Sequence, residues 1–248
     1  MVGSRTRQPL FLCPLGILEE HFMSTAPTST NPPLVCWNCH ERTLGTHFCS
    51  GCGKLQQIPQ SSDYFALFEM PKKLWIEMEG LERKFLQLSW KLHPDNFVNA
   101  TELERDLSLK RSSELNDAYR TLRDPVGRVE YLLGIEGERK EGEKKQQAPP
   151  ELLEEVFELN ESLDELREAR ESGGDLTALR GSLEAARDNF QAKLTEVDAQ
   201  LQAAAREWDA ALAGDSATRK KIMARLNELL NRRSYIRNLV TNVKKELV

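Results

Sequence analysis

The sequence predicts an all-α protein in which two helical regions follow a small cysteine-rich module. Three observations support this prediction. Apolar residues recur at three- and four-residue steps from about residue 63 to the C-terminus. Four of the five cysteines fall in one short stretch near the N-terminus, and a glycine- and charge-rich segment divides the helical pattern into two parts.

The composition is that of a globular chain with more than one domain. Of the 248 residues, 40% are hydrophobic and 29% are charged, and the formal net charge is −5. This balance excludes a collagen-like chain and a wholly disordered one. The mild acidity argues against a dedicated nucleic-acid binder, and no apolar run approaches the roughly 18–20 residues of a membrane-spanning helix. We therefore expect neither nucleic acid nor a membrane as a partner.

Residues 1–33 are expected to form a leader without a folded core. They contain no acid before Glu19 and end in a stretch rich in serine, threonine and proline. Such a segment is compatible with an organelle transit peptide, a plain disordered tail or a secretory signal. Cys13, the fifth cysteine, lies in this leader and receives no role.

Residues 34–58 are predicted to form a zinc-binding module. Two C-x-x-C pairs have the spacing of a zinc knuckle, and they supply four candidate ligands: Cys36, Cys39, Cys49 and Cys52. Four thiolates complete a tetrahedral shell, so the zinc would be structural. His40 and His47, which lie between the ligands, are interpreted as bystanders.

The cysteine spacing also allows two disulfides, a redox dithiol, or iron held as in rubredoxin. If the module binds zinc, its folding depends on the metal, because so short a segment has little core of its own. We expect a Cys36→Ser substitution to disorder the module and to leave the helical regions almost unaffected.

The first helical region, residues 62–134, is predicted to form a helical hairpin. Its two long helices flank a polar loop at residues 93–95, where the proline turns the preceding residue away from helical angles. Leu103 is expected on the buried face of the second long helix. The expected helices cover, in order, residues 63–68, 71–92, 101–123 and 125–133.

The second helical region, residues 150–248, is predicted to form a three-helix bundle. A linker over residues 135–149 separates it from the hairpin. Glycine-containing breaks at residues 173–174 and 214–215 divide it into three helices, each with one apolar stripe. Each stripe would be buried against the other two helices.

The first helical region resembles a J-domain. The tripeptide His93-Pro94-Asp95 lies between two amphipathic helices, after Asp63-Tyr64-Phe65 and before the segment that begins at Leu115 with the sequence LNDAYRTL. The whole order of parts, residues 34–248, resembles the iron–sulfur cluster co-chaperone family of the HscB type, in its eukaryotic, mitochondrial form. Phe97 and the segment over residues 159–163 also fit that family.

The resemblance implies a J-type co-chaperone, not an enzyme. Such a protein stimulates the ATPase of a mitochondrial 70-kDa heat-shock chaperone and delivers an iron–sulfur cluster scaffold protein to it. The sequence shows no nucleophile–base pair and no phosphate-binding glycine loop, in agreement with this implication. The implied chaperone-binding residues are His93, Pro94, Asp95, Lys91, Arg83 and Lys84. The implied location is the mitochondrial matrix, with the cytoplasm as the alternative.

The first helix of the C-terminal bundle is implied to bind the scaffold protein. The candidate residues are Leu153, Glu154, Phe157, Glu158, Glu161 and Glu165, with Tyr235 on the last helix. The two apolar members fall beside the core stripe, so we expect them to face solvent within a rim of carboxylates. The alternative is that both complete the bundle core. Residues 151–171 contain nine acids and two arginines, and this charge favours a basic partner.

Two other functions stay open on the residues alone. One is a J-domain and zinc-finger adaptor for a different client, and the other is an iron-binding redox protein. The sequence does not distinguish a monomer from a homodimer.

Overall fold

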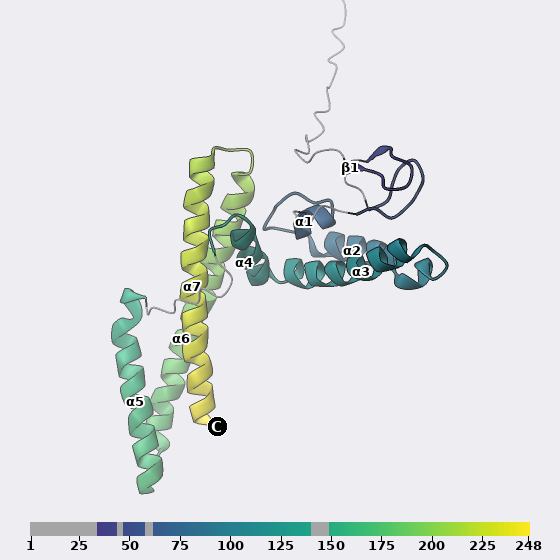
Figure 1. Cartoon of the computed structure of the whole chain (residues 1–248). Helices are drawn as coiled ribbons and strands as arrows, with labels where there is room; N and C mark the ends of the chain where they lie inside the picture. The colour runs from purple at the N-terminus through teal and green to yellow at the C-terminus, as the bar shows by residue number, and fades with distance from the viewer. Residues whose placement is uncertain (1–33, 44–46, 58–61, 140–148) are drawn as a thin grey trace, which may run out of the picture.

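The computed structural model describes residues 34–43, 47–57, 62–139 and 149–248. These parts form an L, with a helical hairpin as one arm and a longer helical bundle as the other (Figure 1). The all-α prediction is confirmed, since the only strands of the described residues are two residues long. The expected leader with Cys13, and most of the expected linker over residues 135–149, lie outside the described residues.

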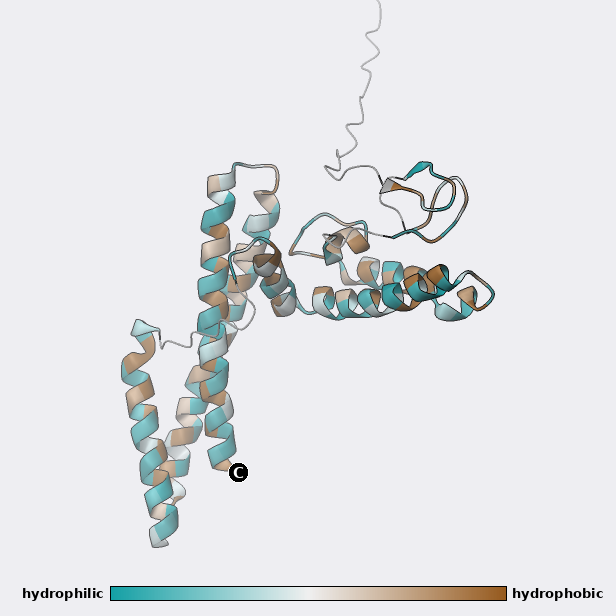
Figure 2. Ribbon diagram, in the orientation of Figure 1, coloured by the Kyte–Doolittle hydropathy of each residue, from teal (hydrophilic) through white to brown (hydrophobic). Residues whose placement is uncertain are grey.

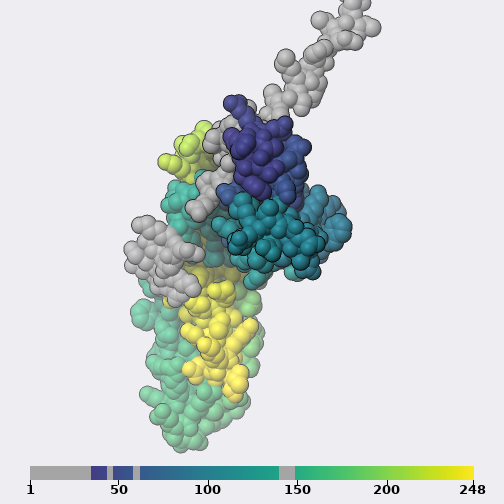
Figure 3. Space-filling view, turned by 45° about the vertical axis from the view of Figure 1, so that its right-hand side comes forward, coloured from purple at the N-terminus to yellow at the C-terminus, as the bar shows by residue number. Residues whose placement is uncertain are grey.

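The cysteine module consists of loops joined by short stretches of pairing. Strands β1 (Leu34–Val35) and β2 (Arg42–Thr43) form an antiparallel pair. A single bridge joins Phe48 to Leu55. Figure 3 shows the module, in purple, lying on the helices of the first arm.

The first arm contains four α-helices and a single-turn 3₁₀ helix. They are α1 (Tyr64–Leu67), α2 (Met78–Leu92), η1 (Pro94–Phe97), α3 (Glu102–Arg123) and α4 (Pro125–Ile135). Side chains that precede three of these helices cap their first turns: Asp63 accepts from the Ala66 N–H, Thr101 from Glu104 and Asp124 from Gly127. Each such cap typically stabilises a helix by about 1 kcal/mol.

The first long helix of the predicted hairpin starts later than expected. Leu74 and Ile76 are buried but precede α2, which begins at Met78. The backbone N–H of Leu74 donates to Asp209 Oδ1, 2.7 Å away, and its carbonyl accepts from Arg128. These partners from distant parts of the chain hold the segment in a non-helical form that still buries its apolar side chains.

The expected position of Leu103 on the buried face of α3 is wrong. Its side chain is 38% exposed, whereas that of its neighbour Glu104 is buried. The carboxylate of Glu104 is turned inward by its ion pair with Lys54 of the cysteine module. This contact, absent from any local pattern, sets the rotation of the first turn of α3.

The second arm is built on two long antiparallel helices, α6 (Thr177–Ala210) and α7 (Ser216–Leu247). After the short η2 (Pro150–Leu152), α5 (Leu153–Ser172) packs along one half of α6 (Figure 1). Apolar residues recur along all three helices (Figure 2), and their buried members fill the bundle core. Gly173 ends α5 with a φ of 71°, a left-handed conformation that glycine adopts at little cost. None of the described helices has the length and apolar character to cross a bilayer.

A junction of hydrogen bonds ties the two arms together. The two carboxylate oxygens of Asp209, near the end of α6, accept from the backbone N–H groups of Leu74 and Trp75 at 2.7 and 2.8 Å. Beside it, the indole Nε1 of Trp208 donates to the carbonyl of Lys72, 2.9 Å away. Because Trp208 is also buried, the junction holds the hairpin at a fixed angle to the bundle.

Candidate functional site

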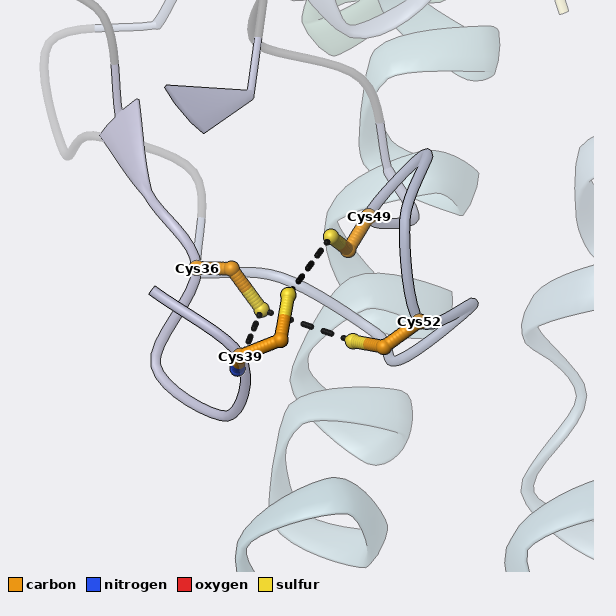
Figure 4. Close-up of side chains that lie close together, drawn as sticks. All are labelled: Cys36, Cys39, Cys49 and Cys52. Atoms are coloured by element: carbon orange, nitrogen blue, oxygen red, sulfur yellow. Dashed lines mark hydrogen bonds between the residues drawn. The ribbon is translucent and has the colours of Figure 1, made fainter. Parts of the chain in front are cut away.

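The four cysteines of the module point at one another from two loops (Figure 4). All four Sγ atoms lie within 4.8 Å of one another, and the Cys39–Cys49 and Cys36–Cys52 pairs are 3.5 and 3.6 Å apart. These cysteines are free, so the module is not held by disulfides. Sulfurs at 2.3 Å from a tetrahedral zinc ion would be about 3.8 Å apart. The donor set and its spacing therefore fit a four-thiolate metal site.

The two C-x-x-C turns have nearly the same backbone. The residue after the second cysteine of each pair is left-handed, with a φ of 60° at His40 and 72° at Gly53. The backbone N–H groups of these residues donate to the carbonyls of Cys36 and Cys49 at 3.0 and 2.9 Å. The glycine in the second turn suits this conformation, whereas the first turn forces a histidine into it. This repeated turn brings both thiols of each pair to the same side.

The thiols differ in acidity. Burial raises the pKa of the Cys36 thiol, but the backbone N–H groups of Cys39 and Asn38 outweigh it, and the net pKa is lowered to about 6. At Cys39 the backbone N–H of Glu41 lowers the pKa, yet burial and the neighbouring thiols raise it to about 12. Four thiolates this close repel one another, and a bound cation would offset this repulsion. The cluster thus offers one ready thiolate, and a metal ion would favour deprotonation of the others.

Neither histidine of the module belongs to the sulfur cluster. His40 is exposed, and His47 is buried with its Nε2 2.9 Å from the carbonyl of Leu67 in α1. His47 therefore joins the module to the first arm, a role that no pattern in the sequence indicates.

Replacing His40 by glycine should leave the metal content of the module unchanged. The side chain binds no other group of the cluster, and glycine adopts the left-handed conformation without the roughly 1–2 kcal/mol that other residues pay. Metal analysis and thermal unfolding of the purified variant check this. A loss of metal would make His40 a ligand and contradict the four-cysteine assignment.

The sequence predicts a module that is independent of the helical regions. In the structure, however, the module packs against the first arm. Leu55 is fully buried and belongs to the same apolar cluster as the helices. Lys54 Nζ lies 2.8 Å from Glu104 Oε2 on α3, and His47 Nε2 lies 2.9 Å from the carbonyl of Leu67 in α1. The module and the hairpin are thus one packed unit.

The Cys36→Ser substitution should therefore lower the stability of the first arm as well as release the metal. Metal binding supplies on the order of 10–16 kcal/mol of folding free energy in modules of this kind. Disordering the module would also uncover Leu55, and loss of a buried leucine typically costs about 2–5 kcal/mol. Thermal unfolding followed by far-UV circular dichroism measures the effect. An unchanged melting temperature of the helices would contradict this packing.

The loop between α2 and α3 presents its polar groups to solvent. The side chains of His93 and Asp95 are 55% and 85% exposed. His93 Nδ1 accepts from the backbone N–H of Asp95 at 3.3 Å, and Asn96 Nδ2 donates to the carbonyl of Trp90 at 2.6 Å. Phe97 is buried and anchors the loop to the hairpin. The loop is thus a short, closed turn with its first three residues available for contact.

The three basic candidates on α2 are placed differently. Lys91 is exposed and lies in the last turn of α2, two residues before His93, with no ion-pair partner among the described residues. Arg83 lies 3.6 Å from the carboxylates of both Glu77 and Glu79. Lys84 points the other way, and its Nζ donates to the carbonyl of Phe68, 2.8 Å away, at the end of α1. The structure therefore brings only Lys91 close to the loop.

Two exposed apolar residues on α2 were not among the candidate site residues of the sequence analysis. Leu86 and Trp90 lie one turn apart on α2, with exposed fractions of 59% and 79%. Both lie on the side of α2 opposite the apolar stripe that includes Leu81 and Leu92, so the helical spacing agrees with their exposure.

The predicted patch on α5 is on the surface. Leu153 is 43% exposed and Phe157 72%, so they do not complete the bundle core. The buried stripe of the helix consists of other residues: Leu159, Leu163 and Leu166. Four exposed carboxylates lie on the same helix along one side of the apolar pair, and none has an ion-pair partner among the described residues: Glu154, Glu158, Glu161 and Glu165. An apolar centre with an acidic rim suits a partner that is apolar and basic.

Tyr235 on α7 is only partly exposed and packs against the core. It lies one turn after Arg232, whose guanidinium is 3.3 Å from Glu151 just before α5. Tyr235 is therefore at the same end of the bundle as Leu153, although the structure does not place it within the exposed patch.

The described residues form a helical protein with an exposed loop on one arm and an apolar–acidic patch on the other. Residues 148–231 match the family model described as the HSCB C-terminal oligomerisation domain. A co-chaperone protein HscB homolog of Vibrio cholerae is 32% identical over 170 residues, which cover 68% of this chain and 95% of the relative. The iron–sulfur cluster co-chaperone protein HscB of Mus musculus is 30% identical over 214 residues, covering 84% of this chain and 81% of the relative.

The crystal structure of the human co-chaperone protein HscB is also similar. It has a TM-score of 0.59 and 26% sequence identity, and the likeness covers 85% of this chain and 96% of the human one. The chain belongs to the HscB family of co-chaperones. Its relatives are named co-chaperones, which fits a protein without an active site of its own.

Proposed function

We propose that this chain is a J-type co-chaperone of iron–sulfur cluster biogenesis. It stimulates the ATPase of a 70-kDa heat-shock chaperone and delivers an iron–sulfur scaffold protein to it. The observation that supports this best is the presence of two unlike exposed surfaces on the two arms of one rigid L. The work is divided among a zinc module (residues 34–58), a J-domain (residues 62–134) and a scaffold-binding bundle (residues 150–248).

The loop acts by binding the chaperone, without bond chemistry of its own. The carboxylate of Asp95 is free to accept charge-assisted hydrogen bonds from a basic partner, while Pro94 fixes the turn that presents it. Lys91 and the apolar pair Leu86 and Trp90 extend this surface along α2. Stimulation requires that the loop bind the ATP-bound chaperone in a form close to hydrolysis more tightly than its other forms.

The patch on α5 holds the scaffold protein. Phe157 is the most exposed aromatic side chain of this arm, and exposed aromatic residues are typical binding anchors. The acidic rim speeds encounter with a basic partner and orients it. Because Asp209 and Trp208 fix the angle between the arms, a bound scaffold is held at a set distance from the chaperone.

The metal is zinc, held by the four cysteines. Zinc supplies no reaction here, and its bonds close the two turns of the module. Metal analysis separates this from the rubredoxin-like alternative, since a zinc protein is colourless and a four-thiolate iron site is red. The mouse and Arabidopsis thaliana relatives are eukaryotic, which supports a location in the mitochondrial matrix.

Retention of purified partners tests the proposed function. Tagged full-length chain should retain both a mitochondrial 70-kDa chaperone, in the presence of ATP, and the iron–sulfur scaffold protein. Retention of the chaperone alone would favour a general J-domain adaptor for another client. Retention of neither would refute the proposal.

A further inference from the structure

A row of polar side chains runs along the buried face of α3. Glu104, Ser108 and Ser112 are spaced four residues apart, so they lie on one side of the helix. Glu104 and Ser108 are 3% and 0% exposed. Buried polar groups are retained where they have hydrogen-bond partners, so the partners of this row indicate its role.

At one end, the row holds the residue that precedes the loop. The hydroxyl groups of Ser108 and Ser112 both donate to the carbonyl of Leu92, at 2.7 and 2.9 Å. Leu92 is the last residue of α2, and the carbonyls at a helix end have no partner within their own helix. The two hydroxyls therefore fix the point from which His93 leaves α2.

At the other end, the row binds the metal module. Lys54 Nζ lies 2.8 Å from Glu104 Oε2, and the same oxygen accepts from Thr101 Oγ1 at 3.1 Å. Thr101 also caps α3 and lies a few residues after the loop. Burial alone raises the pKa of the Glu104 carboxyl, but the hydrogen bonds from Lys54 and Thr101 outweigh it and lower the pKa.

Lys54 belongs to the same turn as two of the metal ligands. Its carbonyl accepts from the backbone N–H of Cys49 at 2.9 Å, and Cys52 lies two residues before it. The position of its ammonium group is thus set by the turn that the metal closes. From the sulfur cluster to Leu92 there is a continuous chain of contacts through Lys54, Glu104 and the rigid helix α3.

We infer that the metal module positions the histidine-proline-aspartate loop, and that Lys54 and Glu104 are the positioning residues through which it does so. This inference rests on the proposed role of the loop in chaperone binding. The module orders both ends of the loop: directly at the start of α3, and through the serine pair at the end of α2. Without Lys54, the buried carboxylate of Glu104 keeps only hydroxyl and backbone donors, and the first turn of α3 loosens.

Hydrogen exchange of the full-length, metal-loaded chain tests this inference. In Lys54→Met, the metal stays bound, but the amides of residues 93–106 should exchange about tenfold faster, as expected when a charge-assisted hydrogen bond is lost. The concentration of chain that gives half-maximal ATPase stimulation should rise, with the maximal rate little changed. Lys54→Arg, which keeps a cation at this place, should restore both values. Glu104→Gln should resemble Lys54→Met.

Lys110→Met is the matched control. Lys110 is also on α3, but its Nζ lies 3.9 Å from Glu114 on the exposed side, so its loss should leave exchange in residues 93–106 unchanged. Wild-type exchange in both Lys54→Met and Glu104→Gln would overturn the inference. The exchange measurement needs no chaperone. If the wild-type chain stimulates no ATPase yet the variants exchange faster, the proposed function fails and the positioning contact stands.

Discussion

Replacing His93 by glutamine should reduce stimulation of the chaperone ATPase at least about tenfold, which corresponds to about 1.4 kcal/mol of lost transition-state stabilisation. The imidazole is half exposed, and Asp95 is its one hydrogen-bonding or ion-pair partner among the described residues. A glutamine lacks the rigid ring that accepts from the Asp95 N–H, so both the first contact group and the shape of the turn are lost. Single-turnover ATP hydrolysis by the purified chaperone measures the effect.

The His93→Gln substitution should not alter the fold. Exposed substitutions usually alter stability by no more than about 0.5 kcal/mol, so the melting temperature and helix content should stay at their wild-type values. His40→Gln is the matched control, because His40 is an exposed histidine away from the loop. Undiminished stimulation by the His93 variant would remove the loop from the mechanism.

The double substitution Leu153→Ala, Phe157→Ala should weaken scaffold binding about 100-fold. Burial of a large apolar side chain contributes about 1.5–3 kcal/mol, and each 1.4 kcal/mol is a factor of ten in affinity. Because both side chains are exposed in the free chain, their loss leaves no cavity and the bundle keeps its stability. Titration calorimetry with the purified scaffold protein measures the change.

A pair of exposed leucines on the other arm provides the control. Leu103 and Leu109 on α3 are 38% and 59% exposed, and their joint replacement by alanine should leave scaffold affinity as it is. Equal losses in the two double variants would mean that the effect reflects general surface apolarity. Wild-type affinity of the α5 variant would show that the scaffold binds elsewhere.

Much of the fold follows from local patterns. Apolar periodicity located every long helix, because each buries one stripe along its length. Asp63 and Asp124 marked helix starts as capping residues do. The errors arose where distant residues intervene. Asp209 holds the segment before α2 out of a helix, and Lys54 turns Glu104 inward in place of Leu103.

In the candidate site, too, some residues could be predicted from local patterns and others depend on contacts between distant parts of the chain. The four cysteines were recognisable because a metal shell requires a fixed ligand spacing, which the sequence displays directly. Two other contacts could not be predicted, because they depend on which elements become neighbours in the fold. Lys84 donates to a carbonyl at the end of α1, and His47 contacts the carbonyl of Leu67. The exposure of Trp90, by contrast, agrees with the local pattern, because this residue lies opposite the apolar stripe of its helix.

The most direct test measures ATP hydrolysis by the purified 70-kDa chaperone with this chain, with the scaffold protein, and with both. If the loop and the patch on α5 are fixed on one rigid body, the chain alone should accelerate ATP hydrolysis. The chain together with the scaffold protein should accelerate it further. The same rate with and without the chain, whether or not scaffold is added, would contradict the account.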